Sequence, residues 1–295
     1  MSDSSITSIY VSHASEKYIR RFAARHLREL GKKTYVVNSH IDSISSDDLF
    51  GFEVINLNRN AGFSAANNAA IDLALKEGVD FFLFINPDVL LPEGWLDSMK
   101  SYLADASLKD AGVFTVPLLG YDFDKDAPTG LVDSLGIYPV WYGRWYDRGA
   151  GKPVENFELG VAPYDLPAAC GALMVIPADV VRSLLSQDGY VFNEHYFMYK
   201  EDIELSVRIR RLNKRVIMLP NLPVYHCRGW ADKRGETPFW ARELSSRNEL
   251  KMHLRYFWRY LPYSMLKYTY VISLERMMIA FSSLTGSRNA CDHTK

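Results

Sequence analysis

The segment DFFLFINPD, residues 80–88, decides the fold class. Its first part, Asp80 to Ile85, is an apolar run of the length that is typical of a buried strand. The run stops at Asn86-Pro87-Asp88, which indicates a turn at the carboxyl end of that strand. Because ligands of open α/β sheets bind at the carboxyl ends of the strands, this segment directs attention to both a sheet and a site.

Strand-like and helix-like segments alternate on both sides of this run. We expect strands at 6–11, 34–37, 52–57, 80–85, 113–116 and 215–219, an ordered segment at 171–176, and helices at 16–30, 64–77, 92–103, 178–186 and 202–212. Strands separated by helices of this length predict right-handed β-α-β units. The expected fold class is therefore α/β, with a Rossmann-like, mainly parallel sheet flanked by helices.

The remaining segments suggest two parts. Residues 118–166 are rich in Gly, Pro, Asp and Tyr and show little periodicity, so we expect irregular loops that border the site. The last 55 residues look helical, with a break near Pro262. We therefore expect a catalytic domain at 1–235 and a helical C-terminal region at 236–295.

Composition is that of an ordinary globular chain of 295 residues, with 48% hydrophobic and 23% charged residues. A net charge of −1 gives no indication of a nucleic-acid partner. Cys170, Cys227 and Cys291 are too widely spaced for a zinc site and odd in number, which favours a reducing compartment. No signal peptide and no apolar run of about 18 residues is visible, so we expect a cytoplasmic protein.

Several common α/β motifs are missing from the sequence. No G-x-G-x-x-G follows the first expected strand, and no G-x-x-x-x-G-K-[ST] occurs, which argues against dinucleotide oxidoreductases and P-loop phosphotransferases. The G-x-S-x-G elbow of α/β-hydrolases is also absent.

Asn and Asp residues follow the expected strands instead. They are Asn38 and Asp42, then Asn60, Gly62 and Asn67, then Asn86 and Asp88. Short amides and carboxylates at these positions can bind a base, a ribose and a metal-bound diphosphate, and Asp88 is well placed to hold Mg²⁺ or Mn²⁺. The alternative is that Asn86-Pro87-Asp88 is only a turn followed by a helix cap.

A second signal is FMYKEDIEL, residues 197–205, where Glu201 and Asp202 begin an amphipathic helix. Acidic residues in a first turn can simply complement the helix dipole. However, the aromatic run from Tyr190 to Tyr199 leads directly into them. A carboxylate in such a setting suits the deprotonation of an alcohol that attacks an electron-poor carbon.

Four stretches together resemble the family 2 glycosyltransferases of GT-A fold, and most of all the bacterial rhamnosyltransferase-like branch. They are NRNAGFSAANNAAIDLA (58–74), FFLFINPDVLLPEGWLDSM (81–99), ACGALMVIPADVV (169–181) and YVFNEHYFMYKEDIELSVRIRRLNKRVIMLPNLPVYH (190–226). Each stretch alone is weak, whereas their order and spacing are specific. The resemblance extends over roughly residues 6–260.

The resemblance implies roles for individual residues. Asp202 would be the general base, with Glu201 as its supporting neighbour, and the metal ligands would be Asp88 and His226. The donor-binding set would be Ser12, Asn38, Asp42, Asn60, Gly62, Asn67, Asn86 and Asp88. Asp133-Ser134-Leu135-Gly136 and Asp147-Arg148-Gly149 would border the sugar pocket. His226 can also be read as a hydrogen-bonded structural histidine, and the two loop pieces as ordinary turns.

Two positions depart from the family pattern. Val37 stands where the family usually has an Asp before the Asn that follows the second strand, and Ser12-His13 replaces the usual Tyr-Asn after the first. Both positions would lie near the base and ribose of the donor. They therefore weaken the assignment of the nucleotide more than the assignment of the reaction.

The resemblance implies an inverting, metal-dependent glycosyltransferase with Mg²⁺ or Mn²⁺ as cofactor. The donor would be dTDP-L-rhamnose, and the acceptor a lipid-linked saccharide or an oligosaccharide of a bacterial surface polysaccharide such as O-antigen or capsule. The alternatives are a UDP-hexose or UDP-galactofuranose donor, and a catalytically inactive nucleotide-sugar-binding scaffold. A nucleotide-sugar oxidoreductase is disfavoured by the missing glycine motif.

The C-terminal region carries a local excess of positive charge. Arg247, Lys251, Arg255 and Arg259 recur at four-residue spacing and form one stripe of a helix. An adjoining face carries Leu250, Leu254, Phe257 and Leu261, with Trp258 at its border. Such a helix can lie on an anionic membrane surface, in keeping with a peripheral position on the inner face of the cell membrane. Alternatively, its apolar side packs on the catalytic domain and its basic side is solvated.

Overall fold

The computed structural model describes residues 5–26, 33–227 and 237–277. The chain divides into two compact units. The first contains residues 1–138, 147–197 and 201–228, and the second contains residues 139–146, 198–200 and 229–295. The boundary expected at 235–236 lies outside the described residues.

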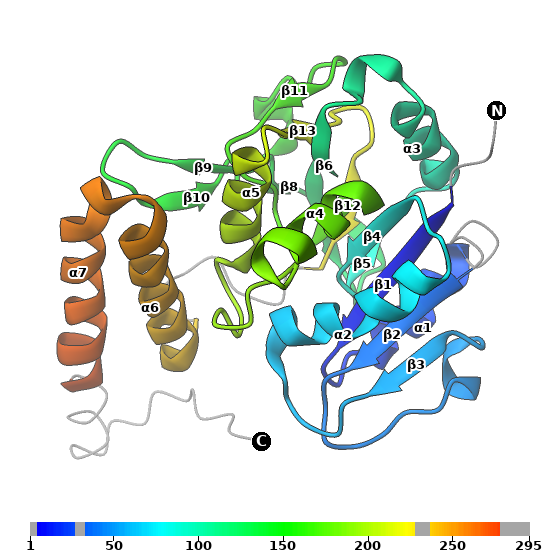
Figure 1. Ribbon diagram of the computed structural model, residues 1–295, viewed down its shortest axis with the longest axis horizontal. Coiled ribbons are helices and arrows are strands. Elements are labelled where there is room, and N and C mark those ends of the chain that lie inside the picture. Colours follow the sequence, from blue (N-terminus) through cyan, green and yellow to red (C-terminus); the bar gives the residue numbers. More distant parts are fainter. Residues whose placement is uncertain (1–4, 27–32, 228–236, 278–295) are drawn as a thin grey trace. The chain divides into compact units, whose positions relative to one another are not determined.

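The first unit is built on a large twisted sheet (Figure 1). In the described part of the chain its strand order is β11-β13-β6-β12-β4-β1-β2-β3. The bounds are β1 Ile6–Ser12, β2 Lys33–Asn38, β3 Glu53–Asn56, β4 Phe81–Ile85, β6 Ala111–Thr115, β11 Tyr164–Asp165, β12 Leu173–Pro177 and β13 Arg215–Met218. Strands β1 to β4 run parallel, as do β6 and β13, whereas β12 is antiparallel to both β4 and β6. The prediction of a mainly parallel α/β sheet is confirmed.

Five α-helices belong to the described part of this unit: α1 Glu16–Phe22, α2 Gly62–Lys76, α3 Trp95–Leu103, α4 Ala178–Asp188 and α5 Glu201–Arg211. Helices α2, α4 and α5 cover one face of the sheet (Figure 1). Their buried Ala70, Val181 and Ile209 pack in one apolar cluster with Phe82 and Phe84 of β4. Strand β4, the segment that decides the fold class, thus lies at the centre of the core.

A second, smaller sheet has the order β5-β14-β7-β8. Its strands are β5 Val89–Leu90, β14 Val224–His226, β7 Leu118–Asp122 and β8 Ala127–Ser134. The expectation that 118–166 is irregular is wrong, because this stretch contains β7, β8, β11 and the two-stranded sheet of β9 (Ile137–Pro139) and β10 (Trp145–Asp147). Register shifts along the β7–β8 pair remove the regular alternation by which sequence patterns reveal strands.

Two helix boundaries also differ from those expected. The helix expected at 16–30 ends as α1 at Phe22 and continues as a 3₁₀ turn to His26, while 27–32 lie outside the described residues. The helix expected from Pro92 begins at Trp95, because Gly94 adopts a left-handed conformation with φ 70°. The other short helices are Asp47–Leu49, Ala106–Leu108, Val154–Asn156 and Trp258–Tyr260.

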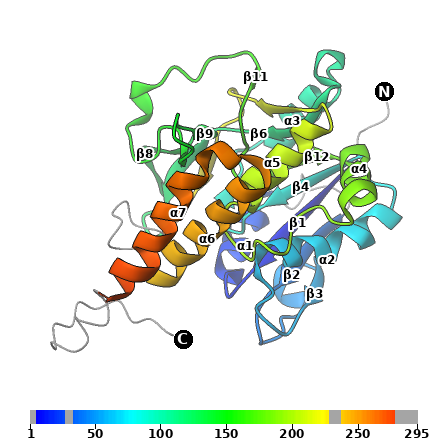
Figure 2. The ribbon, with the colours of Figure 1, turned by 60° about the vertical axis from the view of Figure 1, so that its left-hand side comes forward.

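The second unit contains α6 (Phe239–Tyr256) and α7 (Leu261–Thr269), followed by a π-helical segment at Tyr270–Glu275. Figures 1 and 2 show α6 and α7 side by side. The expected break near Pro262 is present, with Pro262 in the first turn of α7, where its missing N–H is tolerated. Among the described helices, none combines the length and the apolar character that crossing a membrane requires.

Helix α6 has an unusual distribution of polar residues. Its buried face contains Asn248, Glu249 and His253, each with 0% exposure, whereas Leu254 is 60% exposed. The apolar face expected from Leu250, Leu254, Phe257 and Leu261 is therefore not the face that α6 buries. Packing of α6 depends on buried polar contacts, which a hydrophobic pattern does not reveal.

Candidate active site

Two side chains from strands of the smaller sheet and one from the turn before β5 meet at one point. His226 is the last residue of β14, Asp88 immediately precedes β5, and Asp133 lies in β8. The Nδ1 atom of His226 lies 2.7 Å from Oδ2 of Asp133, and its Nε2 atom lies 3.2 Å from Oδ1 of Asp88. The structure thus brings together the predicted pair Asp88 and His226, and it adds Asp133.

Electrostatics in this trio favour a charged imidazole. Burial by itself lowers the pKa of His226, but attraction to Asp88 and hydrogen bonding to Asp133 outweigh burial and raise that pKa to about 10. Without a metal ion, the ring at neutral pH is therefore a buried cation shared by two carboxylates. To ligate a metal, the ring would first have to lose the proton on Nε2.

The chemistry of the trio suits part of a divalent-cation site. Among the described residues, no group of three or more His, Cys, Asp or Glu side chains is arranged as a complete metal site. Asp133 is 3% exposed and holds Nδ1, so Nε2 faces Asp88, whose side chain is 22% exposed. The Asp88 carboxylate and Nε2 of His226 could supply two ligands to a cation, while Asp133 holds the other ring nitrogen. The remaining ligands would be phosphate oxygens and water. The residues fit such a partial site.

Asp202 lies in the first turn of α5 and is held by main-chain groups. Its Oδ2 atom accepts a hydrogen bond of 3.0 Å from the Gly171 N–H, and its Oδ1 atom accepts one of 2.8 Å from the Ile203 N–H. A Cβ added at Gly171 would lie 3.2 Å from Cβ of Asp202, so a larger residue there would crowd the carboxylate. Two main-chain donors thus fix the orientation of the Asp202 carboxylate.

Asp202 and the Asp88 turn are linked through the start of β12. The N–H of Asn86 donates to the carbonyl of Ala172 over 2.9 Å, and the preceding residue, Gly171, donates to Asp202. The carboxyl end of β4 and the start of α5 therefore meet at one edge of the sheet. Glu201, the first residue of α5, is 7% exposed and so contributes a buried carboxyl group next to Asp202.

The residues predicted around the second strand hold a loop together. Ser12 donates to Glu16 over 2.6 Å. The side-chain amide of Asn38 donates to the carbonyl of Asp42 and to Oδ1 of Asn56, over 2.7 and 2.8 Å. The Asp42 side chain itself is 86% exposed. Asn38 and Asp42 are thus in contact, but through the main chain of Asp42.

The residues predicted at the start of α2 make local bonds. Oδ1 of Asn60 accepts from the Gly62 N–H over 3.1 Å, and the amide of Asn67 donates to the Phe63 carbonyl over 2.9 Å. Gly62 has φ 79°, and a Cβ there would overlap the carbonyl oxygen of Phe197. Gly62 is therefore required for the close approach of α2 to the segment that precedes α5.

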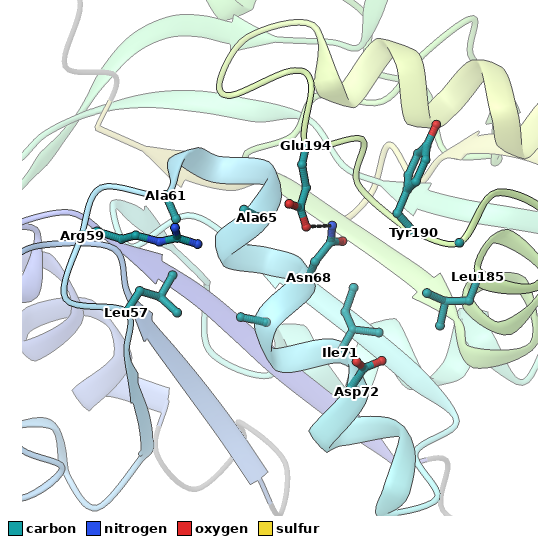
Figure 3. Close-up of a pocket in the computed structure, with 12 residues that line it drawn as sticks. Leu57, Arg59, Ala61, Ala65, Asn68, Ile71, Asp72, Leu185, Tyr190 and Glu194 are labelled. Carbon is teal, nitrogen blue, oxygen red and sulfur yellow. Dashed lines mark hydrogen bonds between the residues drawn. The ribbon is translucent and has the colours of Figure 1, made fainter.

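A cavity of about 330 Å³ lies on the outer side of α2 (Figure 3). Its rim includes a hydrogen bond of 3.0 Å from Asn68 to Glu194, and Arg59, Asp72 and Tyr190 contribute polar groups. None of the predicted site residues lines this cavity. The cavity therefore shares no lining residue with the trio of Asp88, Asp133 and His226, and Asp202 does not line it.

Comparison with solved structures identifies the fold. The chain superposes on GalNAc-T7, solved with UDP, GalNAc and Mn²⁺, with a TM-score of 0.62 over 87% of this chain and 49% of that one, at 12% identity. Residues 1–349 of S. aureus TarS give a TM-score of 0.50 over 91% of this chain and 72% of that one, at 16% identity. The chain has the GT-A fold.

Sequence comparison finds distant relatives. The chain is 27% identical over 218 residues to the low-salt glycan biosynthesis hexosyltransferase Agl10 of Haloferax volcanii, a match that covers 70% of this chain and 62% of that protein. It is 24% identical over 239 residues to the rhamnosyltransferase WbbL of Escherichia coli K12, covering 74% and 81%. The chain thus spans less than two thirds of the length of the hexosyltransferase. It matches no protein-family model.

Asp133 is the site residue whose contact the sequence did not reveal. It was expected only to border a sugar pocket, within Asp133-Ser134-Leu135-Gly136. It lies 93 residues from His226, and the two meet only because β8 and β14 both pair with β7. The one available signal was a carboxylate within an otherwise apolar and small-residue stretch.

We expect Asp133→Asn to lower the free energy of unfolding by roughly 3–5 kcal/mol, because it removes one partner of a buried charged pair. Stability that depends on the His226 cation is complete below the unfolded pKa of about 6.5 and is lost as pH rises toward 10. The variant should therefore lose most stability at neutral and acidic pH, and little at pH 10. Urea unfolding in EDTA at several pH values measures this.

Asp122→Asn is the matched control. Asp122 lies in β7 of the same sheet, pairs with the exposed Lys125 and accepts hydrogen bonds from the N–H groups of Asp124 and Lys125, all near the surface. That variant should change stability by less than about 1 kcal/mol. Equal losses for the two variants would contradict a special role for the buried trio.

Proposed function

We propose that the protein is an inverting glycosyltransferase that moves a sugar from a nucleoside-diphosphate donor to a saccharide acceptor. The observation that carries the proposal is that residues 171–172 hydrogen-bond both to Asp202 and to Asn86, in the turn whose Asp88 pairs with His226. Similarity to a hexosyltransferase and a rhamnosyltransferase supports this reaction class.

In the proposed reaction Asp202 acts as general base. Hydrogen bonds from Gly171 and Ile203 fix its carboxylate, and in the reaction this carboxylate accepts the proton of an acceptor hydroxyl. The acceptor oxygen then forms a bond to the anomeric carbon as the bond from that carbon to the diphosphate breaks. Attack opposite the leaving group inverts the configuration, through an oxocarbenium-like transition state.

Asp88 and His226 would hold a divalent cation at the donor diphosphate. When bound, such a cation neutralises the charge that develops on the leaving group. Asp133 would keep the His226 ring oriented by holding Nδ1, as carboxylates commonly do for metal-bound histidines. The proposed cofactor is therefore Mg²⁺ or Mn²⁺.

For the donor we propose dTDP-L-rhamnose, used in the synthesis of a bacterial surface polysaccharide. The support is the resemblance of the four stretches at 58–74, 81–99, 169–181 and 190–226 to the rhamnosyltransferase-like branch, together with the match to a rhamnosyltransferase over 74% of this chain. A UDP-hexose donor is the competing assignment, supported by the match to a hexosyltransferase.

A nucleotide screen tests the donor and the metal together. We expect dTDP with Mn²⁺ to raise the thermal unfolding temperature more than UDP or GDP, because a ligand that binds only the folded state stabilises it. Asp88→Asn should lose the Mn²⁺-dependent part of the shift. Differential scanning fluorimetry with and without EDTA measures both effects, and a larger shift with UDP would favour the hexose donor.

Replacing the proposed base tests the reaction itself. Asp202→Asn should reduce the rate of sugar transfer by about 100-fold to 10,000-fold while donor binding persists, because an amide cannot accept the proton. Asp179→Asn is the control, since Asp179 occupies the first turn of α4 and is 68% exposed. Full activity of Asp202→Asn would contradict the assignment. Absence of transfer and hydrolysis in the wild type across a donor panel would support the scaffold alternative.

We also propose that the second unit contacts an anionic membrane surface, where a lipid-linked acceptor resides. Leu254 and Trp258 are 60% and 80% exposed, next to the exposed Arg255 and Arg259. Burial and the positive charge of Arg247 lower the pKa of Lys251, in keeping with a crowded basic stripe. Apolar side chains flanked by cations suit the interface of an anionic bilayer.

Vesicle binding tests this surface. The double variant L254S/W258S should bind vesicles containing phosphatidylglycerol at least tenfold more weakly than the wild type, since two interfacial anchors are lost. Val161→Ser is the control, because Val161 is 77% exposed in the first unit. Co-sedimentation at low and high salt separates the electrostatic contribution to vesicle binding from the contribution of apolar side chains that insert into the bilayer. Failure of the wild type to bind at low salt would overturn the membrane proposal.

A further inference from the structure

Residues 196–199, which lead into the proposed base, carry four successive carbonyl groups that each accept a hydrogen bond. We call residues 196–200 the strap. The Tyr196 carbonyl accepts from the Ser64 hydroxyl over 2.6 Å, and the Phe197 carbonyl accepts from the Phe63 N–H over 2.8 Å. The next two carbonyls accept from one side chain of the second unit. The strap is therefore fixed along its length before α5 begins.

The last two residues of the strap have an unfavourable backbone conformation. Tyr199 and Lys200 have φ values of 70° and 73°, in the left-handed region that non-glycine residues rarely adopt. They immediately precede Glu201 and Asp202. Two successive residues of this kind persist only where their surroundings hold them, and such segments commonly occur at functional sites.

Asn248 of α6 supplies the contacts that hold this end of the strap. Its Nδ2 atom donates to the carbonyl of Met198 and to that of Tyr199, both over 2.9 Å. Because the side-chain amide has two hydrogens, both donors are used on consecutive carbonyls of the strained segment. Asn248 is fully buried, so water does not compete for these bonds.

The neighbouring residue on α6 adds a charged contact. Glu249 is fully buried and pairs with Lys267 of α7. Burial raises the pKa of Glu249, and the positive charges of Lys200 and Lys267 outweigh this and lower it. Lys200, the last residue of the strap, is therefore close enough to be attracted to α6 as well.

We propose that Asn248 is a positioning residue for Asp202. It holds the strap in its left-handed turn, and the covalent link from Lys200 to Glu201 transmits this geometry to the start of α5. The inference rests on the proposed role of Asp202 as general base. It gives α6 a part in the reaction that no pattern of charge or hydrophobicity in that helix indicates.

A positioning role predicts a specific kinetic effect. Asn248→Ala should lower kcat by about 10-fold to 100-fold and leave the KM for the donor within about twofold, because Asp202 rather than the donor site is displaced. Hydrogen exchange at the amides of 200–203 should become faster. Asn248→Gln, which keeps the NH₂ group on a longer arm, should recover part of the lost kcat.

Ser246→Ala is the matched control. Ser246 is equally buried in α6, but its hydroxyl donates to the Glu243 carbonyl of its own helix. A purely structural role for Asn248 would give both variants the same loss of thermal stability and the same small kinetic effect. If Asn248→Ala does not fold, Asn248→Ser, with one donor for two carbonyls, is measured in the same way.

The outcomes separate this inference from the proposed function. If Asp202→Asn is inactive but Asn248→Ala keeps the wild-type kcat and the wild-type rate of hydrogen exchange, only the positioning role is overturned. Active Asp202→Asn overturns the general base, and the positioning role with it. Loss of kcat in Asn248→Ala with an unchanged donor KM, and with Ser246→Ala normal, is the supporting result.

Discussion

The contact of His226 with Asp88 and Asp133 is the constraint on which the smaller sheet and the proposed site depend. A buried imidazolium is tolerated only with compensating charges, and here each carboxylate comes from a different segment of chain. Strands β5, β14 and β8 must therefore be in register for the charge to be compensated. The same register places Asp88 at the carboxyl end of β4, where the fold makes room for a ligand. In the proposed mechanism, the chemistry would use the same three side chains that compensate this buried charge.

A buried ion pair within α5 likewise fixes a neighbouring segment of the chain. Glu204 and Arg208, with 0% and 4% exposure, pair within that helix, and the Arg208 guanidinium also donates to the carbonyls of Tyr190 and Val191. The beginning of the aromatic run is thereby tied to α5, just as the strap ties its end. Both ends of a loop without regular structure are fixed by polar contacts, so the first turn of α5 has a defined position. A base that must meet a hydroxyl within hydrogen-bond reach needs such definition.

The sequence allowed the parallel core to be predicted because β4 and helices α2, α4 and α5 follow simple periodicities. It also indicated Asp88, which closes the turn after an apolar strand, whereas His226 came from the family resemblance. It did not reveal β7 and β8, whose register shifts break the alternation. Nor did it reveal Asp133 as a partner, because contacts across 93 residues depend on strand pairing rather than on local pattern. Asn38 and Asn67 look like ligand-binding amides in sequence, yet both donate to nearby carbonyls.

Helix α6 illustrates why pattern alone misjudges such a segment. Helix α6 buries Asn248, Glu249 and His253 beside the apolar Ala241, Leu244 and Met252, while Leu254 is exposed. Its inner face therefore combines apolar packing with polar contacts. Asn248 makes two of these polar contacts to the strap. The exposed apolar residues beside arginines are the observation behind the proposed contact with an anionic membrane surface. In the two proposals, α6 contributes Asn248 to the strap and Leu254 to the membrane-binding surface.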